Sequence, residues 1–167
     1  MKTYIEFFLF CSLVIMKDRY YFIDHTADVL FRAEAESLSG LFVQAGLALF
    51  DTQTDLDRVG DTEVREISGR HKNVEYLLFD FLDDLLLFKD SECLFFSRFE
   101  ISIHIEMNDF GQEEYVLSAK CYGEEIVEGK HELTVDVKAI TLHLFDVSEK
   151  EFDDGNSGWE CQVLLDI

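Results

Sequence analysis

The spacing of apolar residues changes about halfway along the chain. Between residues 37 and 85 they recur every three or four positions, as on the buried face of an amphipathic helix. Beyond residue 96 they alternate with polar residues, as on a strand with one buried face. The pattern predicts an α+β fold in which two amphipathic helices pack on a mostly antiparallel or mixed β-sheet.

Each predicted helix begins at a residue that is typical of an N-cap. Ser37 precedes the first helix and Asn73 precedes the second, and both side chains can accept a hydrogen bond from a free backbone N–H. The apolar stripes consist of Leu38, Leu41, Phe42, Ala45 and Leu49 in the first helix, and of Val74, Leu77, Leu78, Phe81, Leu82 and Leu85 in the second. The opposite side of the second helix carries Glu75, Asp80, Asp83 and Asp84, which we interpret as a solvated face.

Strands are predicted on both sides of the helices. In the first half they cover residues 20–23, 29–35 and, more weakly, 62–68. In the second half they cover residues 99–105, 115–121, 133–145 and 159–167, with a turn at NDFG and a loop at 148–158. In the run from 133 to 145, strict alternation puts Asp136, Lys138, Ile140 and Leu142 on one face.

Composition indicates a single globular domain with an acidic surface. The chain has 167 residues, 48% of them hydrophobic, and no proline or Gly/Ser-rich linker marks a domain boundary. Asp and Glu number 35 against 14 Lys and Arg, a net charge of −21. Such a surface repels phosphate backbones, so we expect no direct, tight nucleic-acid binding, whereas a basic protein or a cation would be attracted.

The N-terminus carries an apolar run from Ile5 to Met16. The run is too short to span a bilayer, and no small-residue cleavage site follows it, so we expect neither a membrane anchor nor secretion. We assign residues 16–167 to the domain and residues 1–15 to an extension outside its core, or to a misplaced start codon. The predicted location is the cytoplasm, with the nucleus as the alternative.

The four cysteines agree with that location. Cys11, Cys93, Cys121 and Cys161 lie far apart without a CxxC pair, which argues against both a zinc knuckle and a disulfide framework. We interpret them as small buried thiols in a reducing compartment.

The stretch DHTADV, residues 24–29, is the first candidate for chemistry. Asp24 can cap the turn before the strand, which is the common role of aspartate between strands. In the other interpretation, one of the two aspartates faces a second carboxylate, and such a pair either takes up a proton or binds a cation. The residues alone leave both interpretations open.

Two further candidates lie near the C-terminus. Lys138 is either an ordinary solvent-facing charge or an ammonium that neutralises carboxylates. Asp166 stands next to the free carboxylate of Ile167, and a tail as apolar as VLLDI is expected to be tied into the sheet. His131 and His143 are 12 residues apart without a second ligand nearby, so we expect ordinary polar roles for them.

Motifs of self-contained enzymes are absent from the sequence. It contains no G-x-G-x-x-G, Walker A, HExxH or GxSxG motif, and no serine or cysteine lies in a recognisable nucleophile context. We therefore expect a protein that is not an enzyme.

The ordered set of motifs resembles the archease family. The motifs are DHTADV at 24–29, SLSGLFVQAGLALFD at 37–51, LLFDFLDDLLL at 77–87, GEEI with the later KH at 123–131, VKAIT at 137–141 and the terminal LLDI. The resemblance covers residues 18–167. It implies a small acidic α+β protein that is a protein cofactor of the RtcB-type RNA-splicing ligase. Such a cofactor promotes guanylylation of the ligase and its multiple turnover in tRNA splicing and RNA repair.

The resemblance also assigns a site. It implies that Asp28, Asp166 and the carboxylate of Ile167 bind a divalent cation, and that Lys138 supplies an essential charge beside it. Oxygen-only ligands favour calcium, magnesium or manganese over zinc, with calcium expected first. The chain departs from the family pattern at Leu142, where the family often has Tyr, and in the long acidic loop at 148–158.

Two other functions are considered. The first is a general chaperone or protein-binding adaptor that uses Phe-rich surfaces and has a structural metal site. The second is a small metal-dependent hydrolase, which is disfavoured because no base or nucleophile accompanies the carboxylates.

Overall fold

The computed structural model describes residues 18–25, 27–153 and 155–167, in which the strands form two sheets. The first sheet has the order β1-β2-β7-β6, with β1 Arg19–Ile23, β2 Val29–Ala35, β7 Ser157–Asp166 and β6 Ala139–Glu151. The second has the order β3-β5-β4, with β3 Glu63–His71, β5 Glu113–Glu125 and β4 Leu94–Met107. Within these ranges, neighbouring strands are paired antiparallel.

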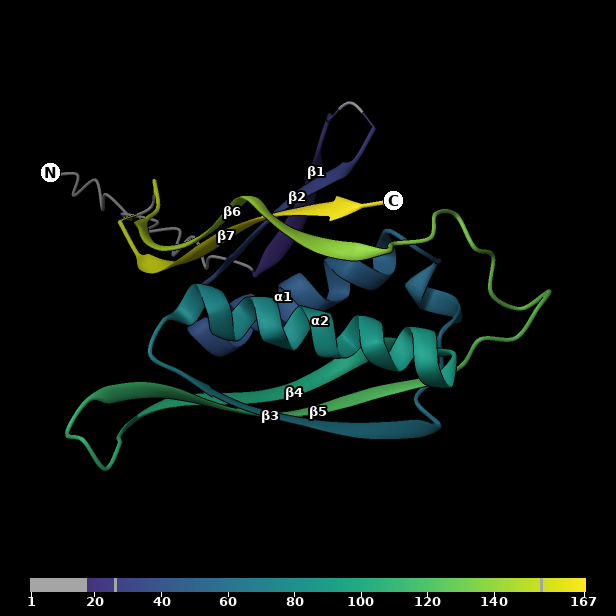
Figure 1. The fold of residues 1–167 in the computed structure, drawn as a ribbon. Helices are drawn as coiled ribbons and strands as arrows, with labels where there is room; N and C mark the ends of the chain where they lie inside the picture. Colours follow the sequence, from purple (N-terminus) through teal and green to yellow (C-terminus); the bar gives the residue numbers. More distant parts are fainter. Residues whose placement is uncertain (1–17, 26, 154) are drawn as a thin grey trace, which may run out of the picture.

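The helices α1 (Leu38–Asp51) and α2 (Val74–Glu92) form a layer between the two sheets (Figure 1). Both helices contact strands of both sheets, and a short 3-10 helix, η1 (Leu56–Arg58), follows α1. The predicted α+β class, the two helices and the antiparallel pairing are confirmed. The structure refines the expected sheet into two sheets that share one helical layer.

This layered arrangement explains the phenylalanine content. Helix α1 buries residues beyond its predicted stripe, including Ala48 and Phe50, because it is covered from two sides. Phe50 makes edge-on ring contacts with Phe95 and Phe96 of β4 at centroid distances of 6.0 and 5.6 Å. Flat, rigid rings fill the space between helix and sheet with little loss of side-chain freedom.

Both predicted helix starts are confirmed. Ser37 Oγ accepts a hydrogen bond from the Gly40 N–H at 3.0 Å. Asn73 Oδ1 accepts from the N–H groups of Glu75 and Tyr76 at 2.7 and 3.3 Å. These side chains satisfy N–H groups that have no partner within the helix.

The acidic face of α2 is solvated only in part. Asp80 and Asp83 are exposed as predicted, whereas Glu75 and Asp84 are half-buried. Burial first, and then the neighbouring charges of Asp80 and Asp83, raise the pKa of Asp84.

The predicted strand at 133–145 is wrong in its boundaries. Residues 132–138 lie outside any strand, and β6 begins at Ala139 and continues to Glu151. Val137 and Ile140 are both buried although an odd number of positions separates them, so strict alternation does not hold here. The predicted loop at 148–158 is correspondingly shorter, because β7 begins at Ser157.

The predicted burial of the cysteines is confirmed at two positions and wrong at a third. Cys121 and Cys161 are buried, and burial raises the pKa of each thiol to about 12. Cys93 is exposed and takes the left-handed conformation at the end of α2. Cys11 lies outside the described residues.

Within the ranges described, no helix is long and apolar enough to cross a bilayer. The predicted extension at 1–15 and its boundary lie outside these ranges, so the domain assignment stays a prediction.

Gly123 generates the first testable prediction. A Cβ atom at this position would lie 1.9 Å from the carbonyl oxygen of Phe95, next to the register shift between Phe96 and Arg98. Gly123→Ala must therefore move the backbone of β4, and we expect a loss of about 2 to 3 kcal/mol in the free energy of unfolding. Urea denaturation checks this, with Ser118→Ala at an exposed position of β5 as the control. Equal stability of the two variants would contradict the close packing at Gly123.

Candidate functional site

Strand pairing brings three distant parts of the chain to one end of the first sheet. Val29, at the start of β2, pairs with Leu165 of β7, and Ala139, at the start of β6, pairs with Asp166. Asp28 directly precedes β2, and Lys138 directly precedes β6. The backbone N–H of Lys138 donates to the carbonyl oxygen of Asp166 at 2.8 Å. We call Asp28, Lys138, Asp166 and Ile167 the carboxylate corner.

The corner is fixed at its C-terminal side. Ile167 packs against the hydrophobic core, while Asp166 is exposed. The apolar tail is therefore tied into the sheet, as predicted. Asp28 is half-buried at the neighbouring strand.

Lys138 differs from every other lysine and arginine in the described ranges. Each of the others makes an ion pair or hydrogen bond through its side chain, as Arg19 does with Glu34 and Lys150 does with Glu160. The exposed ammonium of Lys138 makes neither, although acidic residues greatly outnumber basic ones. Lys138 is thus the one lysine or arginine in the described part of the chain whose side chain has no partner there.

The donor atoms of the corner fit a hard cation. Two aspartates and a terminal carboxylate offer only oxygen, which calcium, magnesium and manganese prefer. Within the described ranges, no group of three or more His, Cys, Asp or Glu side chains is arranged for a metal ion. The corner has two such side chains and a main-chain carboxylate, so its assignment as a metal site stays a prediction.

The turn before Asp28 includes residue 26, which lies outside the described ranges. Ala27 has a φ of 79°, a left-handed conformation that is uncommon for residues other than glycine. The proposed capping role of Asp24 concerns the same turn and stays a prediction.

Lys89 holds the segment that leads to Lys138. Its Nζ donates to Asp136 Oδ1 at 2.7 Å and to the carbonyl oxygen of Val137 at 2.9 Å, and its side chain is only 7% exposed. Burial lowers the pKa of Lys89, but the hydrogen bonds and charges of Asp136 and Asp90 outweigh it and raise that pKa above its usual value. Sequence reasoning missed this residue, although its place four positions after Leu85 continues the apolar stripe of α2.

Gln53 holds the same segment from the end of α1. Its backbone carbonyl accepts from the Thr134 N–H at 2.9 Å, and its side-chain Oε1 accepts from the Val137 N–H at 3.4 Å. Gln53 itself is buried. The ends of both helices therefore replace a strand partner for residues 132–138, which explains why β6 begins late.

Glu124 closes the loop before this segment. Its Oε1 accepts from the Gly60 N–H at 2.7 Å, from Lys130 Nζ and from His131 Nε2 at 2.9 Å. The Val127 N–H donates to His131 Nδ1, so Nε2 carries the proton and neither nitrogen is available to a metal. The ordinary polar role predicted for His131 is confirmed. The Gly60 N–H and then Lys130 lower the pKa of Glu124 to about 2.

A bulge in β6 places apolar side chains near the corner. The pairing of β6 with β7 shifts register between Thr141 and Asp146, and Leu144 has a φ of 59°. Leu142 and Leu144 are exposed there. The alternation in the sequence did not indicate this break.

Comparisons with known proteins give one consistent result. The family model described as the archease protein family (MTH1598/TM1083) matches residues 20–167. Protein archease of Pyrococcus abyssi is 39% identical over 144 residues, which cover 86% of this chain and 95% of that protein. Protein archease-like of Drosophila melanogaster is 35% identical over 156 residues, which cover 93% of this chain and 95% of that protein.

A solved structure agrees with these matches. The solution structure of a protein from Methanobacterium thermoautotrophicum has a TM-score of 0.69 and 30% identity, and the match covers 89% of this chain and 98% of that one. The range matched by the family model includes every residue of the carboxylate corner.

Glu124 should make stability depend on pH. Because its pKa is about 2 in the folded chain against an ordinary 4.5, its contribution is complete above pH 4.5 and is lost as the pH falls through 2. We expect Glu124→Gln to cost about 1 to 2 kcal/mol in free energy of unfolding at pH 7. The difference from the wild type should shrink between pH 5 and pH 2 in urea titrations. Glu125→Gln, at the exposed neighbour, is the control, and a pH-independent difference would contradict this role.

Lys89→Met should loosen the segment before Lys138. The variant leaves the carbonyl of Val137 without its donor, and we expect a loss of about 1 to 2 kcal/mol in free energy of unfolding. Amide hydrogen exchange should speed up in residues 132–138 more than in the strands. Lys120→Met, at an exposed position of β5, should change neither measurement.

Proposed function

The chain belongs to the archease family, and on this premise we propose that it is a protein cofactor that activates an RtcB-type RNA ligase. In this role it promotes guanylylation of the ligase and multiple turnover in tRNA splicing and RNA repair. It works without being an enzyme itself, through contacts at the carboxylate corner. Family membership supports the class of function, and the geometry of the corner supports the place.

The observation that carries the proposal is the free ammonium of Lys138. The backbone N–H of Lys138 donates to the carbonyl oxygen of Asp166, whereas its side chain has no partner among the described residues. A surface ion pair contributes little to stability, commonly below about 1 kcal/mol, so the fold does not need a partner for the exposed ammonium of Lys138. Such an arrangement is typical of a group whose partner arrives with another molecule.

The carboxylates of the corner have a second role in this proposal. Asp28, Asp166 and the carboxylate of Ile167 would hold a divalent cation, with calcium expected first and magnesium or manganese as alternatives. The cation would supply concentrated positive charge, beside Lys138, for an anionic group of the ligase or its nucleotide. The residues would then help to arrange a metal with GTP, or stabilise a ligase conformation that is competent for guanylylation.

Charge supports a basic protein partner. The net charge of −21 attracts such a surface over long distances and speeds association, while it repels RNA. The proposed contact is therefore with the ligase itself, and the location that follows is the cytoplasm or nucleus in which RNA is spliced.

The chaperone alternative depended on Phe-rich surfaces. Among the phenylalanines in the described ranges, only Phe22 and Phe110 are exposed, and the other rings are buried or half-buried. These ranges offer no phenylalanine surface of the kind that this alternative needs.

Removing a charge from the corner should abolish activation. We expect Asp28→Ala, Lys138→Ala and Asp166→Ala each to lower stimulation of the cognate ligase at least tenfold in a multiple-turnover RNA ligation assay, with unchanged thermal stability. Asp83→Ala, which also removes one negative charge but at an exposed position of α2, is the control and should activate normally. If all three variants stimulated the ligase like the wild type, the corner would not be the site.

Cation binding is tested separately from activation. Calorimetric titration with calcium, magnesium or manganese should show one site on the wild type. Asp28→Asn and Asp166→Asn should each weaken it at least tenfold, because each removes a charged oxygen donor. Unchanged cation affinity in both variants would remove the metal from the proposal and leave the role of Lys138 to be judged by ligation.

A further inference from the structure

The hairpin between β4 and β5 extends past the helical layer (Figure 1). Ile101 and Ile103 of β4 pack against the core, but the strand continues beyond them to Met107. Ile105 and Met107, two and four residues after Ile103, are 56% and 62% exposed, and Phe110 at the tip is 87% exposed. Phe110 is the most exposed of the large apolar residues in the described ranges.

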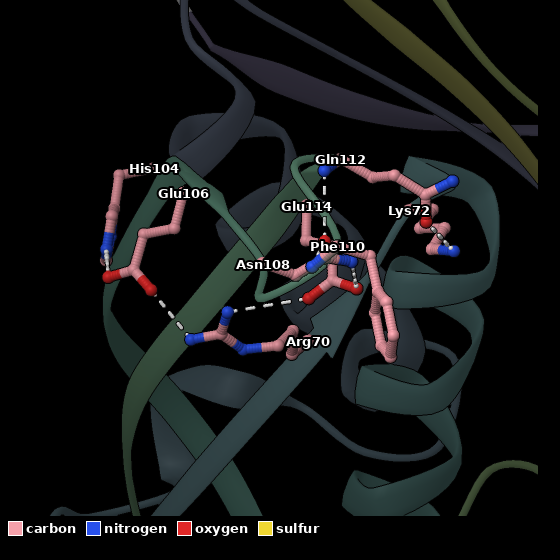
Figure 2. A network of polar contacts seen from close by, with 8 residues as sticks. All are labelled: Arg70, Lys72, His104, Glu106, Asn108, Phe110, Gln112 and Glu114. Carbon is pink, nitrogen blue, oxygen red and sulfur yellow. Dashed lines mark hydrogen bonds and ion pairs between the residues drawn. The ribbon is translucent and has the colours of Figure 1, made fainter.

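The tip of this hairpin is held in one conformation. Asn108 Oδ1 accepts from the N–H groups of Phe110 and Gln112, both at 3.0 Å, and Asn108 Nδ2 donates to Glu114 Oε1 at 2.8 Å (Figure 2). Gly111, with a φ of 71°, completes the turn. The backbone is therefore held by hydrogen bonds at Phe110 itself and two residues after it.

Arg70 ties both strands of the hairpin to β3. Its guanidinium donates to Glu106 of β4 at 2.7 Å and to Glu114 of β5 at 3.4 Å (Figure 2). Lys72 bonds Gln112, and His104 contacts Glu106 at 2.8 Å. These polar contacts hold the β4–β5 hairpin rigid while its apolar side chains stay exposed to water. A surface that is already ordered loses less conformational entropy when it binds a partner.

Charge decides what this hairpin can bind. Asp109 and Glu113, beside Phe110, are exposed and form no ion pair with the described residues. A second copy of the chain would bring the same acids and a net charge of −21, and RNA or an anionic membrane would be repelled as well. The surface that remains favourable is a protein with an apolar pocket bordered by lysine or arginine, and aromatic and methionine side chains are enriched in such contacts.

We propose that Phe110 is a docking anchor for the basic protein partner, the RtcB-type ligase. This inference rests on the proposed function. The hairpin lies at the other end of the molecule from the C-terminus and the corner (Figure 1). Phe110 therefore contributes to affinity and not to activation, whereas the corner contributes to activation.

The test uses the purified ligase of the same organism and the full chain. Binding is measured by calorimetry, and stimulation of ligation is measured up to saturating concentrations. Phe110→Ala should raise the Kd at least tenfold and still reach wild-type stimulation at saturation. Asn108→Ala keeps the ring but removes the bonds that hold it, and its Kd should rise at least threefold. Leu87→Ala, which truncates a side chain of α2 that is 61% exposed, is the matched control and should bind within twofold of the wild type.

The outcomes separate the two proposals. A wild-type chain that neither binds nor stimulates the ligase refutes the proposed function. A wild type that does both, beside a Phe110→Ala variant with equal Kd, overturns the docking anchor alone. The docking anchor is also overturned if Phe110→Ala fails to stimulate the ligase at saturation. The same holds if the wild type sediments as a dimer and Phe110→Ala sediments as a monomer.

Discussion

The path of the chain into Lys138, one member of the carboxylate corner, depends on the buried ammonium of Lys89. Residues 132–138 have no strand partner, so their backbone groups must find hydrogen bonds elsewhere. Gln53, after α1, accepts from the N–H groups of Thr134 and Val137, and Lys89, near the end of α2, donates to the carbonyl oxygen of Val137. A charge at a core-facing helix position is costly to desolvate, and Lys89 offsets this through Asp136 and the carbonyl of Val137. These bonds fix the backbone of the segment that leads to Lys138 and β6.

Charged residues in the described ranges have two different roles. Glu34 is buried between Arg19 and Lys150, and Glu124 accepts three hydrogen bonds, so these carboxylates join elements of the fold. Asp28, Lys138 and Asp166 make no side-chain ion pair among the described residues, although they lie at the ends of neighbouring strands. The sheet thus fixes the backbone of the corner, while these side-chain charges have no ion pair within the described part of the chain.

Local patterns predicted much of this structure because local physics determines it. N-cap side chains at Ser37 and Asn73 act within one helical turn, and their effect is visible in the sequence. The two sheets were not predictable, since a helix buried from two sides and one buried from one side both show an apolar stripe. The late start of β6 depends on contacts with Lys89 and Gln53 that are 47 and 84 residues away in the chain. The alternation of apolar and polar residues along the sequence gives no information about hydrogen bonds to such distant residues.

The free lysine is informative because of the charge excess around it. Side-chain pairing of surface ions contributes little, commonly below about 1 kcal/mol, so an unpaired acid in a chain of 35 acids needs no explanation. An unpaired lysine is less expected in this chain, since Asp and Glu outnumber Lys and Arg by 35 to 14. Every other described cation has found an ion-pair or hydrogen-bond partner, and several join strands of a sheet, as Arg70 does. Among the described lysines and arginines, Lys138 alone has a side chain without a partner, although its backbone is bonded to Asp166, and its proposed binding role rests on this combination.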